Sequence, residues 1–184
     1  RCISRDEIPK LLSSASSVRW RSLFSTLTLT GLRISEALAL TWDDIDLENG
    51  LIYIRSGKTD AAQRSVMCID ALKANLRAWR LQQVPGAVFV FASSENGPPS
   101  RREALRALRA AEKHAGLAKY TLHELRHTFA SILIAQGELP TFVASQMGHA
   151  DPGVTMKTYA HLFEKEESIT RASERLQEAF GGMV

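Results

Sequence analysis

The chain has 184 residues, of which 45% are hydrophobic, and this is enough for the buried core of one ordinary domain. Its formal net charge of +3, with 23 Lys and Arg residues, suits a polyanionic partner without requiring one. The two cysteines, Cys2 and Cys68, form neither a metal-ligand pair nor a disulfide pattern, so we expect reduced thiols in a cytoplasmic protein. The longest apolar run, residues 87–92, is too short to span a bilayer.

The first forty residues predict three helices separated by turns. Ser4 and Glu7 have capping-box spacing at the start of the first helix. A second helix through residues 19–30 ends at Gly31, and a third follows in residues 32–40. Arg33 therefore lies at the beginning of a helix, next to a turn.

The centre of the chain predicts a small sheet. Residues 51–55 and 64–69 are rich in β-branched side chains and predict a hairpin, with Lys58 in its polar loop. Residues 87–91 are predicted as a third, buried strand. Helices are predicted over 70–83 and 100–114, and the remainder is helical with turns at glycines. The expected fold class is α+β, mainly α-helical, with a three-stranded antiparallel sheet.

The segment HELRH, residues 123–127, spells the HExxH motif, in which two histidines bind Zn²⁺ and the glutamate acts as a base. Thr121 and Glu124 have capping-box spacing, which places HELRH at the start of its helix and gives Glu124 a structural role. The Gly and His that extend the motif in metzincins are replaced by Ala130 and Leu133. A zinc metallopeptidase with a downstream glutamate ligand remains a minor alternative, and we expect neither a metal nor a cofactor.

A second interpretation of the same helix rests on Arg126, which follows His123 by three residues. An imidazole and a guanidinium on one helical face can bind a single anion. Taken alone, each further candidate has a plain structural explanation: Arg33 could form a surface ion pair with Glu36, and Lys58 could be a solvated loop residue. The complete candidate set is Arg33, Lys58, His123, Arg126, His149 and Tyr159.

The order of this set and its flanking residues, TGLRISEAL, HELRH, MGH and TYAH, resemble the catalytic domain of tyrosine recombinases of the phage integrase family. The resemblance covers essentially the whole chain. It implies the tyrosine recombinase catalytic fold over residues 1–184, with the N-terminal core-binding domain of a longer protein absent. It also implies a site-specific recombinase or integrase that cleaves and rejoins DNA through a 3′-phosphotyrosyl intermediate, for integration or excision of a phage or other mobile element.

The resemblance further implies a role for each principal residue. Tyr159 would attack the scissile phosphate, and Arg33 and Arg126 would bind its nonbridging oxygens. Lys58 would protonate the departing 5′ oxygen. His123 would act as the base toward the tyrosine, whose ordinary pKa near ~10 makes it a poor nucleophile at neutral pH.

The remaining site residues are given supporting roles. His149 would donate a hydrogen bond to the phosphate. Glu36 would orient the first arginine, and Glu124 and His127 would brace the site. Tyr53 and Tyr120 compete with Tyr159 for the nucleophile's place, but only Tyr159 follows MGH at the spacing of the family.

The expected partner is double-stranded DNA at recombination sites, bound by a homotetramer that is a monomer when free. We expect a cytoplasmic, nucleoid-associated protein with no membrane contact. A C-terminal apolar stripe packs either on its own domain or on a neighbouring protomer: Ile169, Ala172, Leu176, Ala179 and Phe180. Two rivals are a type IB topoisomerase, which usually has Lys where this chain has His123, and a catalytically silent DNA-binding module.

Overall fold

The computed structural model describes residues 2–55, 63–92 and 97–160, together with the pairs 173–174 and 177–178. In these ranges the chain is mainly helical, and its small sheet has three antiparallel strands, so the predicted fold class is confirmed. The elements are α1 (Glu7–Ser13), α2 (Val18–Thr30), α3 (Ile34–Ala39), η1 (Trp42–Asp44), β1 (Ile45–Asp46), β2 (Leu51–Ile54), β3 (Arg64–Met67), α4 (Asp70–Arg80), α5 (Arg101–Ala115), α6 (Leu122–Ala135), α7 (Pro140–Met147) and α8 (Pro152–Tyr159).

The sheet has the order β1-β2-β3, in which Ile52 of β2 lies opposite Val66 of β3. The prediction that residues 87–91 form its third strand is wrong. This run makes one isolated bridge, between Phe89 and Thr41, and the place of the third strand is taken by the two-residue β1. Only Val90 and Phe91 of this run are fully buried, and Val88 is exposed. An apolar run alone does not specify which partner will bind its backbone.

Side chains complete the hydrogen bonding of residues 87–91. The indole of Trp79 donates to the carbonyl of Val90, and the amide of Gln83 donates to the carbonyls of Phe89 and Val90 at 3.0 Å each. Two backbone bonds, from Trp42 to the Val88 carbonyl and from Val90 to the Leu40 carbonyl, satisfy further groups of this run. Because buried backbone groups need partners, side chains and these two bonds together take the place of a regular strand ladder.

Helix α2 lies at the centre of the fold and contributes Leu23, Phe24 and Leu27, all fully buried, to the first core cluster. It ends at Gly31, as predicted, where a φ of 66° gives the left-handed conformation that glycine adopts readily. A Cβ at Gly31 would collide with the ring of Phe129 on α6. The glycine therefore allows α6 to approach the end of α2 and the beginning of α3.

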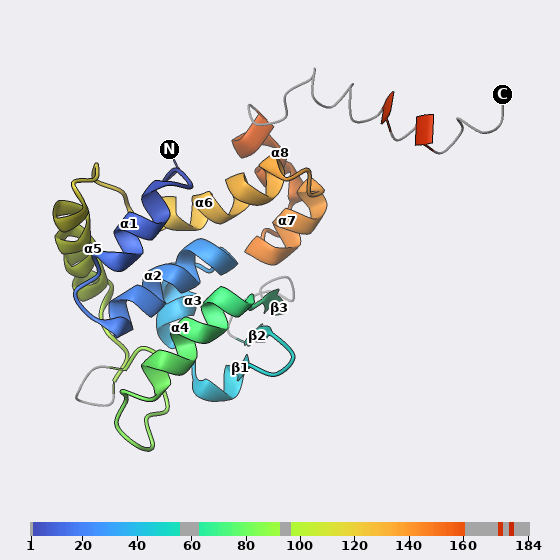
Figure 1. Ribbon diagram of the computed structural model, residues 1–184. Helices are drawn as coiled ribbons and strands as arrows, with labels where there is room; N and C mark the ends of the chain where they lie inside the picture. The colour runs from blue at the N-terminus through green and yellow to red at the C-terminus, as the bar shows by residue number, and fades with distance from the viewer. Residues whose placement is uncertain (1, 56–62, 93–96, 161–172, 175–176, 179–184) are drawn as a thin grey trace.

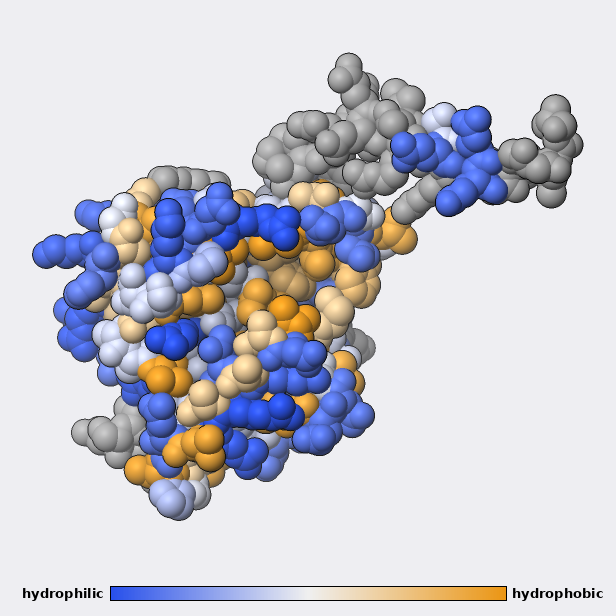
Figure 2. All heavy atoms as spheres, in the orientation of Figure 1, coloured by the Kyte–Doolittle hydropathy of each residue, from blue (hydrophilic) through white to orange (hydrophobic). Residues whose placement is uncertain are grey.

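Helices α6, α7 and α8 lie together at one end of the molecule, and α4 and the sheet lie at the other, with α2 between them (Figure 1). A second core cluster joins these three helices and includes Phe129, Val143 and Tyr159. On the face shown in Figure 2, hydrophilic side chains predominate over scattered apolar ones. No helix in the described ranges is long and apolar enough to cross a membrane.

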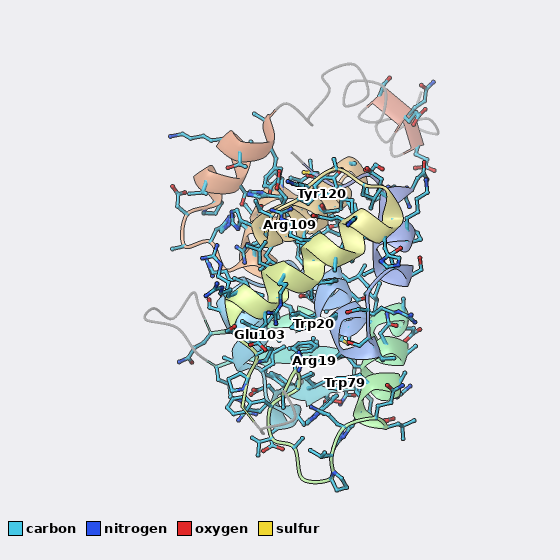
Figure 3. All side chains as sticks on the ribbon, turned by 90° about the vertical axis from the view of Figure 1, so that its left-hand side faces the viewer. Arg19, Trp20, Trp79, Glu103, Arg109 and Tyr120 are labelled. Atoms are coloured by element: carbon cyan, nitrogen blue, oxygen red, sulfur yellow. The ribbon has the colours of Figure 1, made fainter. Side chains whose placement is uncertain are left out.

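Helix α5 crosses the face seen in Figure 3 and fixes the segment that leads into α6. Arg109 donates to Glu112 at 2.8 Å and to the carbonyl of Tyr120 at 2.9 Å, and Glu112 accepts from the Tyr120 backbone at 2.6 Å. The Tyr120 hydroxyl is hydrogen-bonded to Glu7 of α1 at 3.0 Å. Tyr120 therefore has a structural role, and contacts from α5 and α1 hold the segment that leads into α6.

Candidate active site

Helix α6 begins as the sequence predicts. Thr121 and Glu124 form a capping box: the Thr121 hydroxyl accepts from the Glu124 backbone at 3.1 Å, and the Glu124 carboxylate accepts from the Thr121 backbone at 2.6 Å. Glu124 is therefore occupied at the helix end. His123, Arg126 and His127 follow within the first two turns of the helix.

Three arginines bind three successive carbonyl groups at the carboxyl end of α7. Arg64 donates from Nε to Gln146 at 2.8 Å, Arg126 from Nη2 to Met147 at 2.7 Å, and Arg33 from Nη2 to Gly148 at 2.9 Å. The carboxyl end of a helix carries partial negative charge and free carbonyls, so it suits cationic donors. This one turn of backbone positions guanidinium groups from α3, β3 and α6.

The same arginines converge on Glu36, whose side chain is 8% exposed. Arg33 donates to the carboxylate from its backbone at 2.7 Å and from Nη1 at 2.8 Å, and Arg64 binds both oxygens, at 3.1 and 3.0 Å. Nη1 of Arg126 lies 3.9 Å from Oε2 of Glu36. Burial alone would raise the pKa of Glu36, but the bonds from Arg64 and Arg33 outweigh it, and the pKa lies below its ordinary value.

Arg126 is the most deeply buried member of the cluster, at 2% exposure. It also donates to the Gly31 carbonyl at 2.7 Å, while its Nε has no hydrogen-bond partner among the described residues. Burial, and secondly repulsion from Arg33, lower the pKa of Arg126 to about 10, so it remains charged at neutral pH. Three guanidiniums share one carboxylate, and the excess positive charge makes the cluster a suitable place for an anion.

Tyr159, the last residue of α8, is 2% exposed, and its hydroxyl is hydrogen-bonded to Nδ1 of His127. Burial first, and repulsion from neighbouring cations second, lower the pKa of His127, which favours the neutral ring. A neutral imidazole with Nδ1 unprotonated accepts a hydrogen bond from the tyrosine hydroxyl. Burial raises the pKa of Tyr159 above its ordinary value, so the hydroxyl is protonated in this state.

His123 is not the hydrogen-bond partner of the Tyr159 hydroxyl in this structure. Its ring packs edge-on against that of His127, with centroids 4.3 Å apart. Burial and the charge of Arg126 lower the pKa of His123 as well. The contact between His127 and Tyr159 spans 32 positions of the sequence, and no spacing rule revealed it.

His149 directly follows the α7 turn. Its Nε2 lies 3.1 Å from Nη2 of Arg126, and its Nδ1 lies 2.8 Å from the Thr155 hydroxyl of α8. Since the guanidinium only donates, Nε2 is the acceptor, which leaves the proton on Nδ1 to be donated to Thr155. Burial, together with the charges of Arg126 and Arg33, lowers the pKa of His149 to about 4.

The structure thus gathers Arg33, Arg126, His123, His149 and Tyr159 around one end of α6. Lys58 lies outside the described residues, as does the C-terminal apolar stripe. In the described part of the chain, no three His, Cys, Asp or Glu side chains are grouped to hold a metal ion. Arg64 was not predicted, because a basic residue at the start of a strand belongs to no motif that sequence reasoning used.

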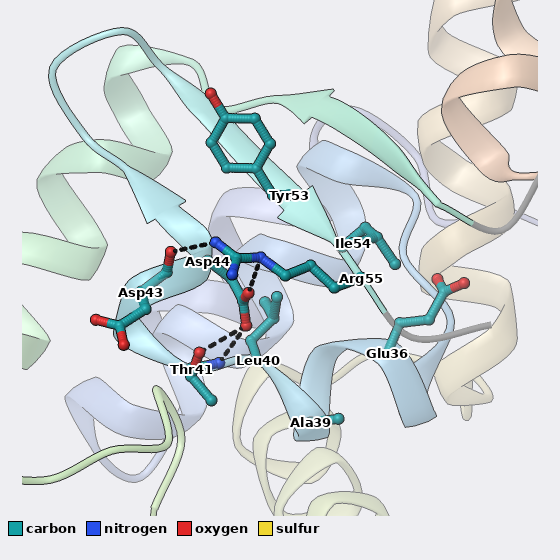
Figure 4. Close-up of a pocket in the computed structure, with 9 residues that line it drawn as sticks. All are labelled: Glu36, Ala39, Leu40, Thr41, Asp43, Asp44, Tyr53, Ile54 and Arg55. Atoms are coloured by element: carbon teal, nitrogen blue, oxygen red, sulfur yellow. Dashed lines mark hydrogen bonds and ion pairs between the residues drawn. The ribbon is translucent and has the colours of Figure 1, made fainter. Parts of the chain in front are cut away.

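Glu36 also lines a pocket of about 380 Å³ beside β2 (Figure 4). Arg55 extends across this pocket, with its Nε 3.0 Å from Asp44 and its Nη2 3.1 Å from the carbonyl of Asp43. Its side chain is 68% exposed. Arg55 is therefore engaged in a surface ion pair and does not belong to the cluster of arginines on Glu36.

Comparison with known proteins identifies relatives of the chain. The chain is 35% identical over 150 residues to the tyrosine recombinase XerC of Xanthomonas campestris, a match covering 79% of this chain and 45% of that protein. It is 30% identical over 176 residues to the tyrosine recombinase XerA of Thermococcus kodakarensis, covering 91% and 62%.

Solved structures give the same result. The crystal structure of XerA recombinase superposes with a TM-score of 0.77 at 27% identity, covering 90% of this chain and 64% of that one. XerH recombinase bound to its difH substrate superposes with a TM-score of 0.77 at 28% identity, covering 94% and 53%. The chain spans only about half the length of several curated relatives, 45% of XerC for example. The sequence profile of the phage integrase family matches residues 1–166 of the 184, and the chain belongs to that family.

Proposed function

We propose that the chain is the catalytic domain of a site-specific DNA recombinase that exchanges strands through a 3′-phosphotyrosyl intermediate. The observation that carries the proposal is the pairing of Tyr159 with the His127 imidazole beside a cluster of arginines held on Glu36 and the α7 carbonyls. A nucleophile, a proton acceptor and cations for a phosphate are thereby close together.

The proposed step is a transesterification. The Tyr159 oxygen attacks the scissile phosphorus as its proton passes to an imidazole, and the bond from phosphorus to the 5′ oxygen breaks. Arg33 and Arg126 stabilise the charge that develops on the nonbridging oxygens. Lys58 supplies a proton to the departing 5′ oxygen, which becomes a hydroxyl. Because the phosphodiester energy is kept in the tyrosyl linkage, a 5′ hydroxyl can reverse the step without ATP or a metal.

The assignment of the proton acceptor depends on which histidine reaches the tyrosine when DNA is bound. In the free chain His127 holds the hydroxyl, while His123 lies behind it in edge-on contact. We therefore propose His127 alongside His123 as a candidate base. In the chain without DNA, His149 carries its proton on Nδ1 and accepts a hydrogen bond from Arg126 at Nε2. To donate a hydrogen bond to the phosphate, its ring would have to turn or its contact with Arg126 would have to break.

Double-stranded DNA is the proposed partner. XerH, which is similar to this chain, has been crystallised bound to its difH substrate, and lambda integrase to a core site. The proposal includes one catalytic domain over residues 1–184, a homotetramer on DNA that is a monomer when free, and a cytoplasmic, nucleoid-associated protein acting on a mobile element. The basic composition supports salt-dependent binding to phosphates.

Covalent trapping tests this function. The chain is incubated in EDTA with nicked suicide duplexes that carry a randomised core. Cleavage of such a duplex releases a short fragment that diffuses away, so the covalent adduct accumulates. The adducts are then separated on a denaturing gel. We expect an adduct with the wild type and with Tyr53→Phe, a matched control for an exposed tyrosine of β2. Tyr159→Phe should give none.

Three outcomes would contradict the proposal. An adduct that survives Tyr159→Phe would exclude this nucleophile, and a wild type that binds but never forms an adduct would indicate a silent DNA-binding module. Relaxation of supercoiled DNA without preference for sequence, by the wild type and not by Tyr159→Phe, would instead favour the type IB topoisomerase.

A further inference from the structure

Arg64 is the least expected member of the arginine cluster, because it comes from the sheet and not from the helices that carry the other two. It is the first residue of β3 and lies opposite Ile54, in the strand pair next to the loop that joins β2 and β3. Its side chain is only 8% exposed. Like Arg126, which is 2% exposed, it therefore lies inside the cluster and not on the surface.

The contacts of Arg64 match those of the two arginines assigned to the phosphate. One edge of its guanidinium binds both oxygens of Glu36, at 3.1 and 3.0 Å, and its Nε donates to the Gln146 carbonyl at 2.8 Å. Arg33 likewise donates both to Glu36 and to a carbonyl of the same turn, that of Gly148. Such a planar two-sided contact requires a guanidinium, which an ammonium cannot replace.

Gly148 provides independent support for this packing. A Cβ at that position would lie 2.7 Å from Cζ of Arg64, far inside a normal contact distance. The φ of Gly148, 65°, is also one that other residues adopt rarely. The turn that carries His149 therefore lies directly against the Arg64 guanidinium, and its backbone cannot move toward β3 without displacing it.

We propose that Arg64 is a positioning residue for the strand-transfer reaction: it fixes Glu36 and the α7 turn relative to each other and so sets the places of Arg33 and Arg126. It acts through those two arginines and does not contact the substrate. This inference rests on the proposed function, and it adds a residue from the sheet to a site otherwise built by helices.

The first test compares cleavage rates on two suicide duplexes. One carries a normal scissile phosphate, and the other carries a methylphosphonate, which lacks one charged nonbridging oxygen. Arg64→Gln and Arg64→Lys should slow adduct formation on the phosphate by roughly 10- to 100-fold, as is typical for residues that orient a site. On the methylphosphonate the same variants should fall within about 3-fold of wild type, because there is less charge for the displaced arginines to neutralise.

The control variant is Arg55→Gln, which removes a guanidinium from the end of the neighbouring strand where it forms an exposed ion pair. We expect its rates to stay within about 2-fold of wild type on both duplexes, since such pairs contribute little. Circular dichroism and thermal melting of all variants show whether they fold.

Three results would overturn the inference. Rates near wild type on the normal phosphate, an equal loss on both duplexes, or unfolding of both Arg64 variants would each assign Arg64 to the fold alone.

A DNA-free measurement separates failure of this inference from failure of the proposed function. In nitrogen-15 spectra, the Nε–H signals of Arg33 and Arg126 should shift or broaden in Arg64→Gln and remain unchanged in Arg55→Gln. Unchanged signals in Arg64→Gln would contradict the positioning role. A wild type without any adduct, together with shifted signals, would contradict the recombinase proposal and leave the structural link in place.

Discussion

Replacing Glu36 by Gln removes the carboxylate that the arginine cluster shares while leaving the size of the side chain unchanged. Each carboxylate oxygen accepts two bonds: Oε1 from the Nη1 atoms of Arg33 and Arg64, and Oε2 from the Arg33 backbone and from Nη2 of Arg64. A glutamine has one oxygen and one NH₂ group. In either orientation, therefore, the NH₂ group faces two donors, and two of the four bonds are lost.

The size of the effect follows from that geometry. Hydrogen bonds to charged groups contribute about 1.5–3 kcal/mol each. Removing one partner from a buried ionic network costs about 3–5 kcal/mol, because the remaining charges are left uncompensated. We therefore expect Glu36→Gln to lower the free energy of unfolding by about 3–5 kcal/mol at neutral pH. For a chain of this length, that corresponds to a fall in Tm of roughly 6–20 °C.

The pH dependence gives a second signature. Because the folded-state pKa of Glu36 is below its unfolded value, its contribution is present above the unfolded pKa, near ~4.3, and is lost as the pH falls through the folded pKa. The wild type should therefore lose its advantage over Glu36→Gln in this acidic range. At neutral pH the full difference in the free energy of unfolding between the wild type and Glu36→Gln should be observed.

Urea unfolding followed by tryptophan fluorescence, at pH values from neutral to acidic, measures both signatures. Glu48→Gln is the matched control, because Glu48 is 91% exposed and pairs with Arg77 at 3.5 Å on the surface. This control should change the free energy of unfolding by less than about 1 kcal/mol. If Glu36→Gln proves as stable as Glu48→Gln at neutral pH, the carboxylate does not hold the arginines together and the reasoning is refuted.

Three further predictions concern the turn after α7 and the histidines. Gly148→Ala should lower the Tm, measured by differential scanning calorimetry, because its positive φ costs an alanine about 1–2 kcal/mol and its Cβ would meet the buried arginine of β3. His149 should stay neutral in NMR titrations down to a pH near its pKa of about 4, and stability should decline as the pH falls below the unfolded value of ~6.5. If His127 accepts the proton, His127→Gln should slow adduct formation roughly 100-fold and more than His123→Gln does, whereas the reverse order would identify His123 as the base.

Local signals in the sequence predicted local structure well. The Thr121–Glu124 pair and Gly31 have physical roles that depend on a few neighbouring residues. The start of α6 and the end of α2, which they respectively predict, are confirmed. The run at 87–91 was misassigned because strands and irregular segments that pack on a core are rich in the same apolar residues. Only the partner distinguishes them, and that partner, at Thr41, is distant in sequence.

The candidate site shows the same division. The residues brought together at α3, α6, α7 and α8 had been selected by their flanking motifs. The contacts that organise them, between Arg64 and Glu36 and between His127 and Tyr159, join elements that pack only in the folded chain. Spacing along one helix predicts neighbours on that helix, but it does not predict which side chain from another element will reach them.

The three successive carbonyls at the end of α7 also have a consequence for variation. Because one turn of backbone holds Arg33, Arg64 and Arg126, a substitution that shifts this turn disturbs all of them together. Changes at buried α7 positions such as Val143, which belongs to the core cluster of Tyr159, should therefore combine non-additively with changes in the arginines. In genetic terms the α7 core and the arginine cluster form one epistatic unit, and second-site suppressors of defects in one should map to the other.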